Sequence, residues 1–305
     1  MKNIIRLSVV IVLFLAVSNN AFCKGPGSTS GSILLEPLTA SSPALADTGS
    51  ALYGKGSCMD KNPAGLNGLE GQEVSIIYRK GFSGGNYAGT VYARDMKDFS
   101  AAAAIKYYST GSIDMYTPDN EKIAKTGKKD IALIISGSDK ISGIPVGINL
   151  KYISSEIFGV KASAFAADIG AQFRDIIKGI DTGITIKNIG TQLKYISVGE
   201  ALPLHAVIGV AHEKNFDSIV LTGLLDVPYY LHEGALMCLL GVELKYDEMF
   251  YFRIGYKLNL DNSQAEDQAI SLGVGVDFNR YSLEYAMGIA GNLNMPHNLS
   301  LRIGF

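Results

Sequence analysis

The sequence predicts an all-β fold, a transmembrane antiparallel β-barrel of about fourteen strands with an N-terminal plug or hatch segment. From residue 73 onward, apolar and polar residues alternate in long runs separated by turn residues, which is typical of strands. The chain has 305 residues and only 18% are charged, below the roughly one quarter typical of soluble domains. Its last strand, "NLSLRIGF", ends on an aromatic residue, Phe305.

Residues 1–23 predict a secretory signal peptide. Lys2 and Arg6 provide the positive region, and the apolar run from Leu7 to Val17 is too short to span a bilayer. Small residues precede a predicted cleavage site after Cys23. Acylation of Cys23 is the alternative interpretation, although Phe22 is unsuitable for the peptidase that processes lipoproteins.

Residues 24–72 predict the hatch segment. This stretch is rich in Gly, Ser and Pro, which also fits an exposed disordered linker. However, it contains more apolar residues than a linker needs, so we expect it to be buried inside the barrel. These residues are Leu34, Leu35, Leu38, Leu45 and Leu52.

Residues 73–305 predict the barrel. Many of the expected strands have the nine to eleven residues or so that a tilted membrane strand requires. They are expected at 73–79, 86–94, 100–109, 130–138, 144–154, 162–173, 180–188, 204–212, 216–225, 233–246, 249–259, 266–278, 280–289 and 296–305. Links such as Asp247-Glu248 are tight, whereas 116–129 and 190–203 are expected to be long polar loops.

One face of these strands is continuously apolar, as in Ile148, Leu150, Phe252 and Ile254. The other face mixes small residues with charges of both signs. A soluble β-sandwich also alternates, with its charges outward. Long strands and a single meander of simple hairpins favour a closed barrel, so the apolar face is expected to contact outer-membrane lipid. Trp is absent, and five tyrosines are expected to form the interfacial belts: Tyr78, Tyr152, Tyr246, Tyr281 and Tyr285.

Several segments resemble the PorV/PorQ-like group, which includes the UPF0164 proteins, within the class of FadL-type barrels. "GSTSGSILLEPLTASSPALADTGSALY" resembles the opening of that group, and "NPAGL" (62–66) matches its most recognisable motif. "GSIDMY", "GINLKYISSEIFGVKASAFAADIGAQFR" and "HNLSLRIGF" fit its strand pattern. The insertion "GKGSCMDK" (54–61) departs from the pattern and leaves the conformation of this loop open.

The resemblance implies fourteen strands and a hatch that folds into the barrel, with Asn62, Pro63 and Gly65 as hatch residues. Asn62-Pro63 is also a simple turn former. Within the group, functions divide between passage of hydrophobic compounds and service as a cargo carrier in protein secretion, and the resemblance leaves both open. Phe305 resembles the terminal signal by which the barrel-assembly machinery recognises outer-membrane barrels.

The sequence gives little support to an enzyme. His205, His212, His232 and His297 lack metal-ligand spacing and are interpreted as rim or loop residues. No Gly-rich element precedes a helix, no nucleophile elbow of the GxSxG kind between a strand and a helix is indicated, and no basic block suggests nucleic-acid binding. We therefore expect no cofactor and no metal. Cys238 is expected on the lipid face and inert.

Charged residues on the inward face are the candidates for a ligand path. They are Lys106, Lys151, Asp168, Glu243, Lys245, Arg253, Glu284 and Arg302. Mixed charges of this kind tune what passes a pore, or simply hold the hatch and solvate the wall.

The favoured function is passive uptake of a hydrophobic small molecule across the outer membrane. The alternative is a secretion component that binds a secreted protein through long external loops such as 116–129. An apolar pocket inside the barrel favours transport, and a sealed lumen favours partner binding.

Overall fold

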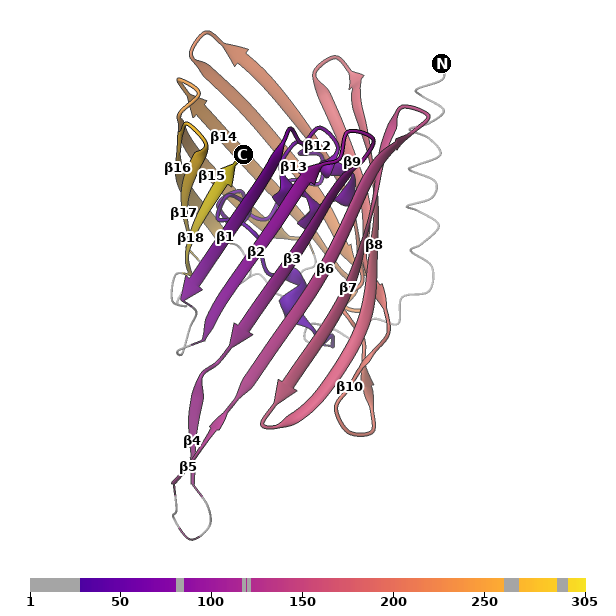
Figure 1. The fold of residues 1–305 in the computed structure, drawn as a ribbon, viewed down its shortest axis with the longest axis vertical. Helices are drawn as coiled ribbons and strands as arrows, with labels where there is room; N and C mark the ends of the chain where they lie inside the picture. Colours follow the sequence, from indigo (N-terminus) through magenta and orange to yellow (C-terminus); the bar gives the residue numbers. More distant parts are fainter. Residues whose placement is uncertain (1–27, 81–84, 117–118, 120–121, 261–268, 290–295) are drawn as a thin grey trace.

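The computed structural model describes residues 28–80, 85–116, 119, 122–260, 269–289 and 296–305. The chain forms a closed antiparallel barrel of 14 strands (Figure 1). The barrel strands are β1 (Gln72–Lys80), β2 (Asn86–Asp95), β3 (Ser100–Ser109), β6 (Lys128–Ile141), β7 (Ile144–Ile157), β8 (Val160–Ile177), β9 (Ile180–Gly190), β12 (His205–Phe216), β13 (Ile219–Tyr230), β14 (Ala235–Tyr246), β15 (Phe250–Asn259), β16 (Ala269–Phe278), β17 (Tyr281–Ile289) and β18 (His297–Gly304).

The barrel closes where the first strand pairs with the last. β1 pairs with β18 from Glu73–Gly304 to Lys80–His297, and each remaining strand pairs with its neighbours in the order of the chain. Closure leaves none of these strands with an unpaired edge, which removes the main liability of a large sheet. The predicted fold class is therefore confirmed.

The two faces of the wall divide as the alternation predicted. Leu150 is 51% exposed and Phe252 is 54% exposed on the outer surface, whereas Asn149 and Lys151, the chain neighbours of Leu150, are buried. Tyr78, Tyr246 and Tyr281 also lie on the outside. Because the outer surface is apolar and the inner surface polar, the barrel has the polarity of a membrane-spanning barrel.

All fourteen predicted strands correspond to barrel strands, but two predicted loops are wrong. The connection after β3 contains a hairpin of β4 (Ser112–Tyr116) and β5 (Lys122–Thr126), and β6 already begins at Lys128. The connection after β9 contains the small hairpin of β10 (Leu193–Lys194) and β11 (Gly199–Glu200). These hairpins are outside the barrel wall, so their sequences lack the apolar face that marks a membrane strand.

A third difference concerns the link between β12 and β13. The sequence predicted a strand from residue 216, but β12 continues to Phe216 and β13 begins at Ile219. Asp217 adopts a φ of 36° in the intervening turn. Residues 212–218 are polar except for Phe216, so the apolar–polar alternation stops before this turn and could not locate it.

The two ends of the barrel differ in the length of their connections. Tight turns at 96–99, 142–143, 178–179, 217–218, 247–249 and 279–280 form one end, here called the short-turn rim. The opposite end, the long-loop rim, contains the β4–β5 and β10–β11 hairpins. In Figure 1 the short-turn rim and the C-terminus lie at the top, and the β4–β5 hairpin extends from the bottom.

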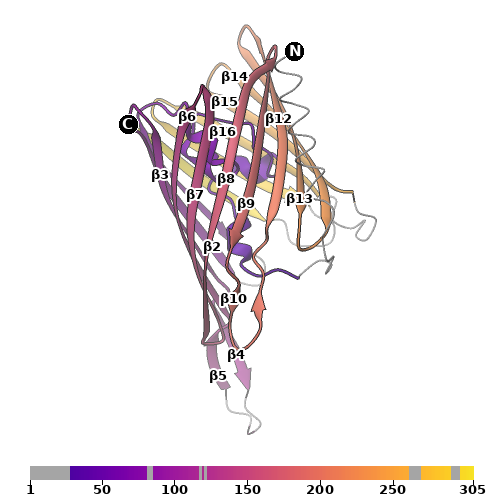
Figure 2. The same ribbon diagram turned by 90° about the vertical axis from the view of Figure 1, so that its right-hand side faces the viewer.

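Residues 28–71, here called the hatch, lie inside the barrel (Figures 1 and 2). The hatch contains the short helices η2 (Ser32–Leu35), α2 (Ser41–Ala44), η3 (Gly56–Asp60) and η4 (Pro63–Leu66). Leu34, Leu38 and Leu45 are buried as predicted, whereas Leu35 is 39% exposed. Within the described ranges, no helix is long and apolar enough to cross a membrane. The predicted signal peptide, including Cys23, lies outside the described residues.

A charge on the outer face tests the lipid assignment. Leu150→Arg, in the middle of β7, is expected to lower the free energy of unfolding in lipid by about 2–4 kcal/mol. Ile141→Arg is the control, because Ile141 is 65% exposed at the end of β6, beside the short-turn rim. There the expected cost is about 0–1 kcal/mol. Urea titration of both variants in vesicles measures the difference, and equal costs would contradict the assignment.

Candidate functional site

The hatch contacts the barrel wall where the wall has no side chains. Seven inward glycines, here called the glycine belt, allow this approach. They are Gly147, Gly170, Gly183, Gly209, Gly241, Gly255 and Gly273. A Cβ on Gly183 would lie 2.0 Å from the Ser50 carbonyl oxygen, and one on Gly255 would lie 2.3 Å from the Ala46 nitrogen. Backbone-to-backbone packing therefore defines where the hatch lies.

The Asn62-Pro63 turn is both a turn former and an anchor. The Asn62 side chain accepts a hydrogen bond from the Ala64 amide (3.0 Å), which caps η4. Its amide group donates to the carbonyls of Ser50 in the hatch (2.9 Å) and Ala171 in β8 (3.1 Å). Gly65 donates to the Asn62 carbonyl, which completes the turn. A fully buried Asn with these partners fixes the hatch against β8.

A buried carboxylate on β13 binds the hatch backbone. Asp226 accepts hydrogen bonds from the Gly49 and Ser50 amides, both at 3.0 Å, and from the Ser50 hydroxyl at 2.9 Å. Hydrogen bonds to a carboxylate are stronger than neutral ones, particularly away from water. Asp226 was absent from the predicted site, because one inward Asp in a strand resembles any other lumen charge.

A second anchor joins Asp60 of the hatch to Lys106 of β3. Lys106 Nζ lies 2.5 Å from Asp60 Oδ1 and also donates to the Glu36 carbonyl. Lys187 of β9 donates to the Asp60 carbonyl at 2.5 Å. Burial raises the pKa of Asp60, but Lys106, Lys187 and Lys61 more than offset this and lower it to about 2. Asp60 therefore remains charged at any physiological pH.

The remaining lumen candidates pair mainly along the wall. Lys151 Nζ of β7 lies 2.6 Å from Asp168 Oδ2 of β8, diagonally across the strand pair. Arg253 Nε of β15 lies 2.5 Å from Glu243 Oε2, its register partner on β14. Arg253 Nη2 also lies 3.1 Å from Glu284 Oε1 of β17, two strands away.

Two further candidates have other partners. Arg302 Nη2 lies 3.4 Å from Asp277 Oδ2, and Arg302 Nη1 lies 3.8 Å from Glu73 Oε2. The sequence analysis selected neither of these two carboxylates as a candidate. Lys245 lies over the Tyr251 ring, 5.4 Å from its centroid. The eight candidates thus form separate groups on the wall instead of one charged ring.

The 54–61 insertion folds as η3 and covers part of the wall. The Gly56 amide donates to Glu73 at 2.6 Å, and a Cβ on Gly56 would lie 2.5 Å from Ala93 of β2. Burial of Cys58 in this helix raises the pKa of its thiol to about 11. The thiol is therefore protonated and inaccessible while the hatch is in place.

The histidines do not gather at one site. His205 begins β12 at the long-loop rim, where it is buried, stacks on Tyr230 and contacts the Pro203 carbonyl. His297 contacts the Tyr285 hydroxyl at 2.6 Å. In the described part of the chain, no group of three His, Cys, Asp or Glu side chains is arranged to hold a metal ion.

Among the cavities that border the hatch, two meet at hatch residues 47–61. The larger of these two, of about 310 Å³, lies beside the long-loop rim and is here called the long-loop cavity. Its apolar lining is Leu35, Val207, Pro228, Tyr230, Met237 and Leu239. Polar and charged residues of the hatch and the wall complete the lining, among them Asp47, Lys61, Lys187 and Asp226. The smaller, of about 90 Å³, is here called the short-turn cavity, and it is lined by hatch leucines and by Glu243 near the end of β14. Small-molecule sites combine apolar walls with polar groups, and the long-loop cavity contains both.

The fold thus defines the class of protein as a fourteen-stranded membrane barrel closed by an N-terminal hatch. Among solved structures, the deltaS2 mutant of TodX, a monoaromatic hydrocarbon channel, is similar with a TM-score of 0.64 and 12% identity over 88% of this chain and 98% of that chain. The Pseudomonas putida toluene transporter TodX has a TM-score of 0.60 and 12% identity over 93% and 99% of the two chains.

A Pseudomonas aeruginosa FadL homologue has a TM-score of 0.58 and 10% identity over 88% and 99% of the two chains. At these identities the similarity establishes a FadL-like barrel fold. No family model matches the sequence, and no curated protein matches it. The finer resemblance to the PorV/PorQ-like group stays a prediction.

The sequence analysis did not select the charged residues that hold the hatch or form ion pairs within it. These are Asp47, Asp60, Lys61, Lys187 and Asp226. The glycine belt was the available signal. Glycines recur at inward positions of seven strands, and strand interiors disfavour glycine unless another backbone approaches closely. Grouping these positions by register would have located the docking surface.

The glycine belt predicts a steric test. In Gly183→Ala the new Cβ would overlap the Ser50 carbonyl, so the 48–52 segment must move away from β9. Gly223→Ala is the matched control, because a Cβ there has no atom within 4 Å. Trypsin is expected to cleave the hatch at Lys55 or Lys61 faster in Gly183→Ala than in wild type or the control. Equal cleavage of all three proteins would contradict the docking.

The Asp60 anchor predicts an energetic test. Lys106→Met leaves the buried Asp60 carboxylate without its closest cation and is expected to cost about 3–5 kcal/mol of unfolding free energy. The double variant Lys106→Met/Asp60→Leu removes both charges, so we expect it to recover most of that loss. Urea unfolding of the single and double variants measures the coupling, and additive losses would exclude a specific pair.

Proposed function

We propose that this protein is an outer-membrane channel that admits hydrophobic small molecules by passive diffusion. The observation that carries the proposal is the long-loop cavity, where an apolar wall from β12, β13 and β14 lies beside the hatch. A barrel that served only as a rigid support would not need a cavity with an apolar wall inside a polar lumen.

The outer membrane is the proposed location because the outer surface of the barrel is apolar and the N-terminus has the pattern of a signal peptide. In such barrels short turns face the periplasm and long loops face outward. The long-loop cavity is then on the external side, where a ligand from the medium would arrive. Insertion would depend on outer-membrane lipid and on the barrel-assembly machinery.

The names of the structural neighbours support the ligand class. TodX is described as a toluene transporter and a monoaromatic hydrocarbon channel, and these are apolar cargoes. The alternative, a secretion component that binds a secreted protein, would be favoured by a sealed lumen. The two cavities beside the hatch argue for passage.

Uptake of the neutral probe N-phenyl-1-naphthylamine tests the proposal. Cells that produce the protein are expected to take up this probe several-fold faster than cells that lack it. Leu239→Asp places a charge in the apolar wall and is expected to abolish the gain, whereas the conservative Leu239→Met retains it. Surface labelling confirms equal amounts of each variant. Uptake that does not depend on the protein, or is insensitive to Leu239→Asp, would reject the channel.

A further inference from the structure

One short piece of the hatch separates the two cavities. Asp47 and Ser50 line the long-loop cavity, while Thr48 and Gly49 between them line the short-turn cavity. Lys61 lines both cavities. The partition between the two sides is therefore only as thick as the 47–50 segment and the Lys61 side chain.

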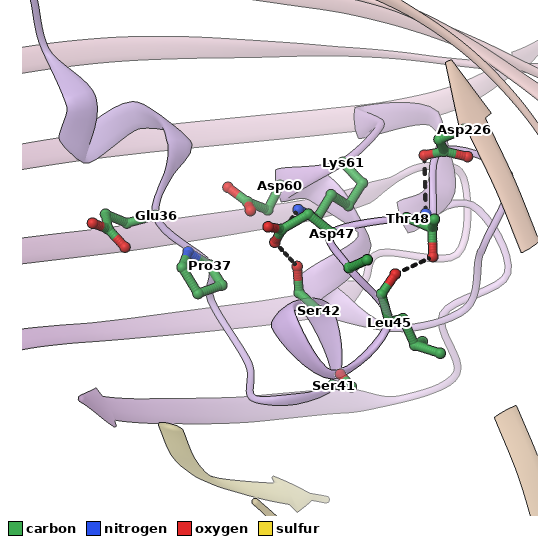
Figure 3. Close-up of polar contacts among 12 residues, drawn as sticks. Glu36, Pro37, Ser41, Ser42, Leu45, Asp47, Thr48, Asp60, Lys61 and Asp226 are labelled. Atoms are coloured by element: carbon green, nitrogen blue, oxygen red, sulfur yellow. Dashed lines mark hydrogen bonds and ion pairs between the residues drawn. The ribbon is translucent and has the colours of Figure 1, made fainter. Parts of the chain in front are cut away.

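An ion pair holds this partition closed. Asp47 and Lys61 lie side by side in the hatch (Figure 3), with Lys61 Nζ 3.0 Å from Asp47 Oδ1. Lys257 Nζ of β15 lies 3.5 Å from the other carboxylate oxygen of Asp47. The Asp47 side chain keeps 32% exposure and that of Lys61 keeps 15%, unlike the fully enclosed Lys106. An ion pair that borders a cavity is weaker than a dry one, since water and ligands compete for it.

The backbone at Asp47 is also held in an unusual conformation. Ala46 and Asp47 have φ values of 53° and 66°, in the left-handed region that side chains disfavour. The turn persists because the Ala46 amide donates to Ser271 of β16 (3.2 Å) and the Asp47 amide donates to the Ser42 carbonyl (2.9 Å). Residues strained in this way and held by their surroundings are typical of elements with two conformations.

We propose that the permeation path runs axially through the hatch, and that the Asp47–Lys61 ion pair is its gate. The inference rests on the proposed function and adds the route and the gate residues. When the pair separates, the two cavities join into one passage from the long-loop rim to the short-turn rim. Asp226 holds the Gly49 and Ser50 amides against β13, so the backbone there stays in place and only the Asp47 and Lys61 side chains need to move.

Single-channel conductance of KCl across planar bilayers tests the gate without any hydrophobic ligand. Wild type is expected to be nearly closed, and both Asp47→Asn and Lys61→Met are expected to raise the mean conductance several-fold. Arg79→Gln is the matched control, because it breaks the 2.5 Å hatch-to-wall ion pair with Glu36 and Arg79 lines neither of the two cavities. Its conductance is expected to equal that of wild type.

An exchange of the two charges tests whether the higher conductance comes from loss of the ion pair and not from misfolding. Asp47→Lys/Lys61→Asp is expected to restore the closed state, and a heat-modifiable band on a gel verifies that each barrel is folded. Unchanged conductance in both single variants, or an equal rise in Arg79→Gln, overturns the gate. The conductance measurement needs no hydrophobic ligand, so the two proposals can fail separately. If the conductance changes as expected but the cells do not take up the probe, the proposed ligand class is rejected and the gate stands. If the cells take up the probe but the conductance of the Asp47 and Lys61 variants does not change, the gate alone is rejected.

Discussion

The structure depends on the close approach of the hatch backbone to the barrel wall. A wall of inward side chains would keep the hatch several ångströms away, and its buried amides would then lack partners. The glycine belt removes those side chains at the places where residues 44–64 pass. Asn62 and Asp226 can then reach hatch backbone groups, and the polar groups of an irregular segment are satisfied without regular secondary structure.

The two ion pairs of the hatch have different roles. Asp60 and Lys106 are fully enclosed, so their ion pair serves to fix η3 and would be strongly destabilising if only one partner were removed. Asp47 and Lys61 border cavities, and their pairing is accessible to competition. The hatch is therefore fixed by the buried Asp60–Lys106 pair and adjustable at the Asp47–Lys61 pair, which is what a plug with a gate requires.

The sequence was sufficient to predict the barrel, because alternation over long strands reports burial on each face directly. It placed Leu150 outside and Lys151 inside, as the structure does. It could not place the partner of Lys106, because ion pairs between hatch and wall depend on how residues far apart in the chain meet. Irregular segments such as 44–64 carry no periodicity, so Asp47 and Lys61 remained unassigned until the hatch was in place.

The most direct test of a docked hatch is the reactivity of Cys58 in vesicles, in a Cys238→Ser chain that begins at residue 24. Cys58 belongs to the hatch, where it is buried and its thiol has a raised pKa, so a maleimide is expected to label it only after unfolding. Slow labelling of the native barrel and complete labelling in denaturant would agree with the account. Rapid labelling of the native barrel would mean that the hatch does not occupy the lumen, and the closed plug would have to be abandoned.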